Sequence, residues 1–289
     1  MSKVYFTKDL TSFGLLNIYE ALNVTLEGKV GVKIHSGEKG NQNYLKPDFM
    51  KPLIDLVNGV IIECNTAYEG ERNTTEKHIK LMDSHGWSKL YNVDILDSEG
   101  DMELLVKNGK FLKKNYVGSH LKNYDSILVL SHFKGHPMGG FGGSLKNISI
   151  GLASSYGKAV IHGAGESEKI WTANHDDFLI SMAEASSSIM DYRKNKIVFI
   201  NVMKNMSVDC DCCSVAEDPK IKDIGILASL DPVALDKACL DLVYNSSDPG
   251  KKDLIERIES RNGLLTVLEA SRLGVGSLDY ELIDIDKNS

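Results

Sequence analysis

Six short apolar runs constrain this chain more than any other feature, because segments long enough for helices separate them. The runs are residues 29–34, 60–63, 127–130, 158–161, 196–200 and 224–228. Short runs rich in Val and Ile are typical of strands buried on both faces of a parallel sheet. Helices are predicted between them at 47–57, 75–85, 176–190 and 232–243, the last with Asp231 as its cap and Pro232 at its first position. The alternation predicts an α/β fold with a mostly parallel sheet flanked by helices.

Length and charge narrow the class of protein. The chain has 289 residues and a net charge of -7, so we expect one module spanning 1–289, with a second lobe allowed to begin near 163–175. An acidic balance gives no field for holding nucleic acid. The chain has neither a leader-like start nor an apolar run of the roughly 20 residues that span a bilayer, so we expect a cytoplasmic protein that binds no membrane. The sequence leaves the oligomeric state open.

Residues able to bind a metal or a polar ligand follow nearly every predicted strand. They are His35, Cys64 with Asn65, Ser131 with His132, His162, Asn201, and Ser229 with Asp231. Ligands of open parallel sheets bind outside the carboxyl ends of the strands. We therefore expect five residues to lie along one edge of the sheet, namely His35, Cys64, His132, His136 and His162.

The segment 131–147 is rich in glycine and carries two histidines and two lysines. Its glycines, Gly135, Gly139, Gly140, Gly142 and Gly143, permit positive φ values and a close approach to a ligand. A helix predicted from Ser144 would expose amides beside Lys134 and Lys146, an arrangement that suits a small anionic ligand or substrate. The predicted cofactor-binding residues are Lys134, Gly139, Gly140, Gly142, Gly143 and Ser144.

A second segment with side chains that could take part in chemistry is 209–213, which contains Cys210, Cys212 and Cys213. In an extended segment Cys210 and Cys212 project the same way and can reach one metal ion. Cys64 and the histidines would supply the remaining ligands, so the predicted metal ligands are His35, Cys64, His132, His162, Cys210 and Cys212. The alternative is that these cysteines are small buried hydrophobes. Five cysteines, three of them within four positions, indicate a reducing compartment rather than a disulfide framework.

Five segments together resemble the uncharacterised iron-sulfur centre proteins of domain of unknown function 362. They are VKIHSGEKG (32–40), SHFKGH (131–136), GFGGSLKN (140–147), DCDC (209–212) and DIGILASLDPVALD (223–236). Many members carry a ferredoxin-like insert with two cysteine-rich motifs after the segment that here ends at His162. This chain has no cysteine there, so the resemblance is to a member without that insert. We expect a metal ion but no ferredoxin-type cluster.

A shorter segment is similar to the glycine-rich motif of the lactate racemase family. That motif has a catalytic His followed ten positions later by the Lys that attaches a nickel-pincer nucleotide. His136 and Lys146 have this separation, with Gly142 and Gly143 one position earlier than in the motif. The sequence thus supports three interpretations. The first is a metalloprotein that uses its metal in redox-related chemistry. The second is a cofactor-dependent isomerase or racemase with His136 and Lys146 as catalytic residues, and the third is a non-catalytic metal or ligand carrier.

Overall fold

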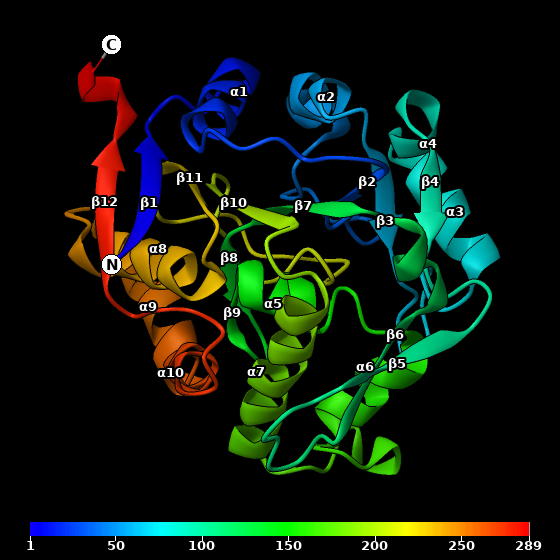
Figure 1. Cartoon of the computed structure of the whole chain (residues 1–289). Helices are drawn as coiled ribbons and strands as arrows, with labels where there is room; N and C mark the ends of the chain where they lie inside the picture. The colour runs from blue at the N-terminus through cyan, green and yellow to red at the C-terminus, as the bar shows by residue number, and fades with distance from the viewer. Residues whose placement is uncertain (289) are drawn as a thin grey trace.

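The computed structural model describes residues 1–288, which build an α/β fold around one mixed sheet of eight strands (Figure 1). The strand order is β12-β1-β11-β10-β7-β2-β3-β4. The strands are β1 Ser2–Thr7, β2 Val30–Lys33, β3 Val60–Glu63, β4 Val93–Ile95, β7 Ser126–His132, β10 Ile197–Met203, β11 Gly225–Ser229 and β12 Tyr280–Asp284. Among these strands, β11 alone runs opposite to its neighbours. The predicted fold class is therefore confirmed.

Helices cover both faces of the sheet (Figure 1). One face carries α1 Ser12–Ala21, α2 Pro47–Leu56, α3 Thr75–Ser84 and α4 Trp87–Leu90. The other carries α5 Ser144–Ser149, α7 His175–Tyr192, α8 Pro232–Asn245, α9 Lys251–Ser260 and α10 Leu264–Arg272. Two hairpins lie outside the main sheet: β5 Asp101–Leu105 with β6 Lys114–Gly118, and β8 Lys134–His136 with β9 Gly140–Gly142. The remaining elements are helix α6 Ser155–His162 and the 3₁₀ turns η1 Ser119–Asn123, η2 Ser167–Lys169 and η3 Ile285–Asn288.

The central strands explain why the apolar runs are continuous. Along β7, Ile127 and Val129 pack into the core on the face of α5, α7 and α8, whereas Leu128 and Leu130 pack under α1 and α2. Successive side chains of a strand point to opposite faces, so a strand covered on both sides needs an apolar residue at every position. Chain segments before and after 163–175 contribute to this one sheet, because β7 pairs with β10.

Two predictions about single elements are wrong. Residues 158–161 form part of helix α6 and not a strand. Because β11 is antiparallel to β10, Ser229 and Asp231 follow it at the opposite edge from the ends of the parallel strands. There Asp231 caps α8 by accepting hydrogen bonds from the backbone N–H groups of Val233 and Ala234, as the sequence predicts for that helix.

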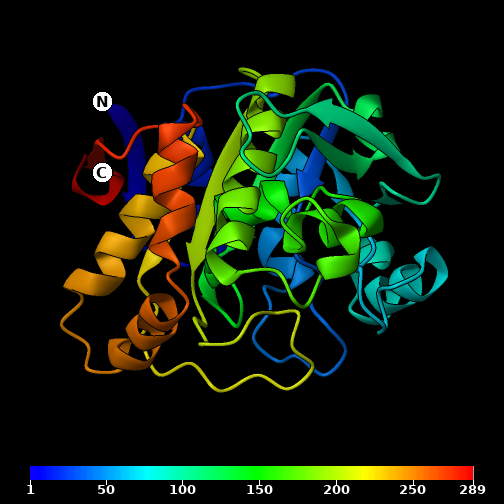
Figure 2. The ribbon, with the colours of Figure 1, turned by 90° about the horizontal axis from the view of Figure 1, so that it is seen from below.

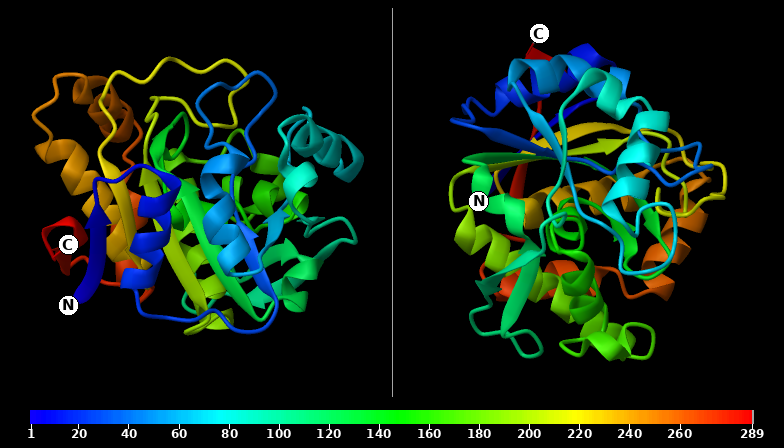
Figure 3. Two further views of the ribbon diagram at one scale, coloured as in Figure 1. Left: turned by 90° about the horizontal axis from the view of Figure 1, so that it is seen from above. Right: turned by 90° about the vertical axis from the view of Figure 1, so that its right-hand side faces the viewer.

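Two loops meet beyond the carboxyl ends of the parallel strands. Figures 2 and 3 show the loop after β2 beside the loop between β10 and β11. The Asn41 side-chain amide donates to the carbonyl oxygen of Cys213 at 2.9 Å, and the backbone N–H of Glu38 donates to the carbonyl oxygen of Asp211 at 2.8 Å. These bonds fix the cysteine-rich segment at this edge of the sheet. Within residues 1–288 no helix is long and apolar enough to cross a membrane.

Candidate metal site and adjoining cavity

A cavity of about 280 Å³ lies at the carboxyl edge of the parallel strands. All five residues that the sequence predicts along one edge line it: His35, Cys64, His132, His136 and His162. The strand ends deliver three of them, because His35 and Cys64 follow β2 and β3 and His132 ends β7. His136 comes from hairpin β8–β9, and His162 is the last residue of α6. The cavity volume is close to the lower end of the usual range for small-molecule sites, about 300–1,000 Å³.

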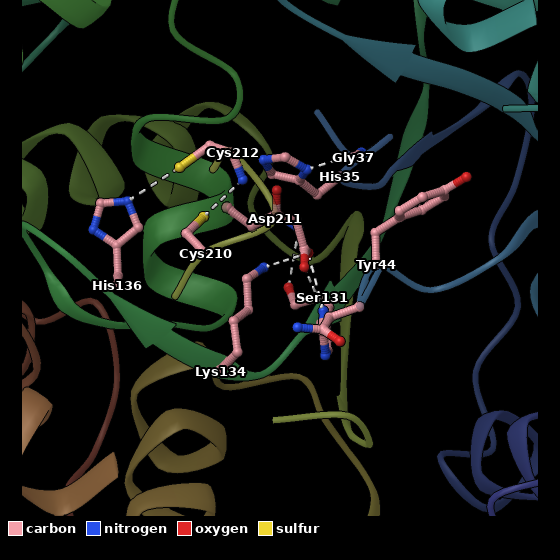
Figure 4. Close-up of polar contacts among 12 residues, drawn as sticks. His35, Gly37, Tyr44, Ser131, Lys134, His136, Cys210, Asp211 and Cys212 are labelled. Carbon is pink, nitrogen blue, oxygen red and sulfur yellow. Dashed lines mark hydrogen bonds and ion pairs between the residues drawn. The ribbon is translucent and has the colours of Figure 1, made fainter. Parts of the chain in front are cut away.

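Three side chains form a compact group of metal-ligating atoms beside this cavity. They are His136, Cys210 and Cys212, whose ligand atoms all lie within 4.8 Å of one another. The Cys212 sulfur is 3.9 Å from Nε2 of His136, and the backbone N–H of Cys212 donates to the Cys210 sulfur at 3.4 Å (Figure 4). Both sulfurs therefore do meet at one point, but through a turn closed by the Cys213 N–H and the Cys210 carbonyl, and not through the expected extended segment.

The His136 ring is held in one tautomer. Its Nδ1 accepts hydrogen bonds from the backbone N–H groups of Met138 at 3.2 Å and Gly139 at 2.8 Å. Burial, together with the charge of Lys146, lowers the pKa of His136 to about 4, so the ring is neutral at pH 7. A neutral ring with an acceptor at Nδ1 carries its proton on Nε2. That proton lies on the side of the sulfurs.

His35 approaches the same sulfurs from the other side (Figure 4). Its Nδ1 accepts from the backbone N–H of Gly37 at 3.1 Å, and its side chain hydrogen-bonds Cys210. Burial lowers the pKa of His35 to about 3. His35 thus also presents Nε2–H to the Cys210 sulfur, and it lies outside the compact group of three.

The two thiols differ in acidity. Burial and the neighbouring Cys212 raise the pKa of Cys210, Lys146 and His136 lower it, and the net direction is downward. For Cys212 the hydrogen bond with Cys210 lowers the pKa, the hydrogen bond with Cys213 and burial raise it, and the net direction is upward. Cys210 is therefore the more acidic thiol of the pair.

Asp211, between the two cysteines, anchors their loop to the sheet. Its carboxylate is buried and lies 2.9 Å from Nδ1 of His132. It also forms an ion pair with Lys134, whose Nζ is 2.9 Å from Oδ2. Burial opposes ionisation, but His132 and Lys134 hold the pKa of Asp211 well below its usual range. Nε2 of His132 donates to the Lys204 carbonyl at 2.6 Å, so protein groups engage both ring nitrogens. His132 and Lys134 position the loop, and neither belongs to the compact group.

The start of α5 is already occupied by a carboxylate of the chain. The backbone N–H groups of Ser144 and Leu145 donate to Asp236 at 2.8 and 2.9 Å, and the Asn201 side-chain amide donates to the same carboxylate at 2.7 Å. This corrects the expected anion site where Gly139, Gly140, Gly142 and Gly143 meet Ser144. A Cβ at Gly143 would lie 2.4 Å from Asp236 Oδ1, so Gly143 makes room for a protein carboxylate rather than for a ligand.

Cys64 and His162 line the cavity away from the compact group. The Cys64 thiol donates to the Leu152 carbonyl at 3.4 Å, and burial raises its pKa to about 12, so it stays protonated. His162 donates from Nδ1 to the Lys158 carbonyl at 2.8 Å and stacks on Phe178 with ring centroids 4.6 Å apart. Neither side chain is within reach of the three-residue group.

Residues 30–241 match the family described as "Domain of unknown function (DUF362)". The chain belongs to this family. The matched range contains every side chain of the cavity wall described above, so the site lies inside the DUF362 domain.

Solved structures with some likeness to this DUF362 protein are distant. The lactate racemase apoprotein from Thermoanaerobacterium thermosaccharolyticum is 15% identical over 68% of this chain and 50% of its own, with a TM-score of 0.39. A structural-genomics protein from Thermotoga maritima is 13% identical over 90% of this chain and 58% of its own, with a TM-score of 0.47. The chain thus spans only about half the length of these proteins. No match was found among curated proteins.

Sequence reasoning missed part of the cavity wall. Lys33 is buried inside the sheet and forms a 2.9 Å ion pair with Glu63, and Lys158 reaches the cavity from α6. Arg72 also lines the cavity; it is buried and pairs with Glu38 at 3.0 Å. A signal for Lys33 did exist, because a lysine inside a continuous apolar run must find a partner when the run is buried.

Proposed function

We propose that this DUF362 protein binds a transition-metal ion through His136, Cys210 and Cys212 and uses it in redox-related chemistry on a small molecule held in the adjoining cavity. The observation that carries the proposal is the set of three donor atoms within 4.8 Å of one another. Two of these residues, His136 and Cys212, also line the cavity. An ion bound here would therefore lie next to the space in which a substrate fits.

The chemistry of the donors supports this assignment. Two thiolates and an imidazole suit Zn²⁺, Cu⁺ and Fe²⁺, and poorly suit Mg²⁺ or Ca²⁺. Three protein ligands leave a tetrahedral ion one further position, as is typical of catalytic rather than structural sites. Ligation of a metal by Nε2 of His136 would require the ring proton to move to Nδ1, which would then lose the two hydrogen bonds that it accepts from the Met138 and Gly139 amides. A metal on Cys212 would displace the thiol proton.

Anaerobic titration with Co²⁺ tests the metal site, because thiolate coordination gives Co²⁺ characteristic charge-transfer absorption. We expect about one equivalent to bind the native chain with that absorption. Cys213→Ser is a matched control, since Cys213 is adjacent and half-buried but lies outside the group. We expect the control to titrate like the native chain and the Cys210→Ser, Cys212→Ser double variant to lose the absorption. A double variant that titrates like the control would contradict the site.

Redox use is tested separately by metal analysis and absorption spectra of anaerobically purified protein, oxidised and reduced. Iron or copper with a reversible spectral change supports it, and zinc without one removes the redox part of the proposal. Iron and sulfide at about four each per chain would instead indicate a ferredoxin-type cluster and contradict a single-ion site. A carrier of metal or ligand would bind in the same way without turnover.

A second candidate function is a cofactor-dependent isomerase or racemase. The observation that favours it is that His136, which carries a proton on Nε2, shares the cavity wall with Lys146. His136 would then transfer a proton to or from a carbon next to a carboxylate, and Lys146 would hold a cofactor. Intact-mass measurement of the chain from its native source tests this function, since a cofactor attached to Lys146 adds mass. An unmodified Lys146 would contradict a role in cofactor attachment.

A further inference from the structure

Positive charge is concentrated in the cavity although the chain as a whole is acidic. Five cationic side chains line the cavity, and among the lining residues Glu63 is the one carboxylate within residues 1–288. The cations are Lys33, Arg72, Lys134, Lys146 and Lys158. A chain with a net charge of -7 has no compositional reason to gather five cations at one place.

Three of the five cations have a buried carboxylate partner. Lys33 pairs with Glu63 at 2.9 Å, Arg72 with Glu38 at 3.0 Å and Lys134 with Asp211 at 2.9 Å. Each of these side chains is at most 9% exposed. These three pairs are complete without a ligand.

Lys146 and Lys158 have no such partner. Neither ammonium forms an ion pair within residues 1–288. Lys158 is 7% exposed and donates one N–H to the Ala153 carbonyl at 2.6 Å, which leaves two donors unused. Lys146 is half-buried, and its ammonium has no hydrogen-bond partner in the described part of the chain. Two uncompensated positive charges at one cavity wall cost folding free energy unless an anion neutralises them.

The rim of the cavity adds an apolar component. Met138, Ile150, Ile170 and Trp171 line it, and Trp171 is 63% exposed. A ligand that contacts both this rim and the two lysines needs an apolar body and an anionic end. Inorganic anions have no such body.

We propose that the cavity binds a small organic anion, a carboxylate or a phosphate ester, with Lys146 and Lys158 as its anion subsite. The proposal rests on the proposed function in one respect, because it takes this anion as the substrate of the metal site. The subsite itself consists of the two lysines and needs no metal. It differs from the expected site at the start of α5, where Asp236 already occupies the amides.

Calorimetric titration of metal-free protein tests the subsite with benzoate, phenyl phosphate and the neutral amide benzamide. We expect at least one of the two anions to bind the native chain more tightly than benzamide, and the stronger anion identifies carboxylate or phosphate as the recognised group. Lys146→Gln should weaken anion binding roughly 10-fold to 100-fold, because a charged hydrogen bond is lost. Lys252→Gln, an exposed lysine on α9, is the matched control and should bind like the native chain.

Trp171 provides a second readout in the same titration. The chain has two tryptophans, of which Trp87 is fully buried, so ligand-dependent fluorescence changes report on Trp171 at the cavity. Lys158→Gln should weaken anion binding like Lys146→Gln, and if the buried substitution prevents folding, the half-buried Lys146 still decides the test. Equal affinity for benzamide and both anions, or unchanged affinity in Lys146→Gln, would overturn the proposal. Because no metal is present, that failure leaves the metal site standing, and a failed metal titration leaves the anion subsite standing.

Discussion

At the scale of single residues, the Cys-Asp-Cys segment divides two tasks between adjacent side chains. The sulfurs of Cys210 and Cys212 gather with His136, whereas the carboxylate of Asp211 between them binds His132 and Lys134. The backbone turns here, closed by a 2.9 Å hydrogen bond from the N–H of Cys213 to the carbonyl oxygen of Cys210. A three-residue motif can therefore hold a candidate ligand pair and also fix itself to the end of β7.

Replacing Asp211 tests this anchor. Asp211→Asn leaves the buried Lys134 ammonium without a carboxylate, and breaking a buried pair in this way costs about 3–5 kcal/mol. We expect that loss in urea unfolding of the metal-free protein. Asp218→Asn, at an exposed carboxylate of the same loop, should change the free energy of unfolding by less than about 0.5 kcal/mol. Equal stability of the two variants would show that Asp211 anchors nothing.

A histidine outside the cavity predicts how stability depends on pH. The hydrogen bond to Asp94, 2.8 Å from Nδ1, raises the pKa of His120, burial opposes the rise, and Glu99 adds to it. A raised folded-state pKa stabilises the fold fully below the unfolded value of about 6.5, and this contribution disappears as pH rises through the folded value. His120→Gln should therefore cost more unfolding free energy at about pH 6 than at about pH 9. A cost that is equal or larger at the higher pH would contradict the assignment.

At the scale of elements, α6 shows where a short apolar run misleads. Residues 158–161 contain Val160 and Ile161, which favour strands, but four residues cannot distinguish a strand from a buried helical turn. Ser154 decides the local structure, because its hydroxyl accepts from the backbone N–H of Gly157 at 2.9 Å and caps the helix. Lys158 and His162, one helical turn apart, consequently both reach the cavity.

Removing that cap should loosen α6. Ser154→Ala is expected to cost about 1 kcal/mol, and hydrogen exchange of the α6 amides should speed up. Ser167→Ala changes a half-buried serine that caps no α-helix and serves as the control. If both variants left α6 exchange unchanged, the cap would not be what starts this helix.

The strands that could be predicted from sequence are those covered on both faces. β2, β3, β7 and β10 are buried along their length and read as continuous apolar runs. The reversed direction of β11 could not be predicted, because strand direction depends on how the chain crosses between layers and leaves the apolar pattern unchanged. The ends of the strands did predict three residues that line the cavity, His35, Cys64 and His132. They did not predict that Asp236, remote in sequence, occupies the amides at the start of α5.

At the scale of the whole molecule, parallel strands concentrate functional groups. The ends of β2, β3 and β7 open into one cavity, and the loop after β10 brings the Cys212 thiol to its wall with the Cys210 thiol beside it. A mixed sheet thereby assembles imidazoles, thiols and ammonium groups from segments more than 100 residues apart in the chain. We expect metal and anion to bind side by side at this edge.

X-ray absorption at the zinc edge of the anaerobically zinc-loaded protein tests the metal site at His136, Cys210 and Cys212 directly, because it identifies the atoms bound to the ion. We expect about two sulfur neighbours at about 2.3 Å and at least one nitrogen neighbour at about 2.0–2.1 Å. The sulfur shell should persist in Cys213→Ser and vanish in the Cys210→Ser, Cys212→Ser double variant. A first shell made of nitrogen and oxygen alone in the native chain, or a sulfur shell that survives in the double variant, would contradict the metal site at His136, Cys210 and Cys212.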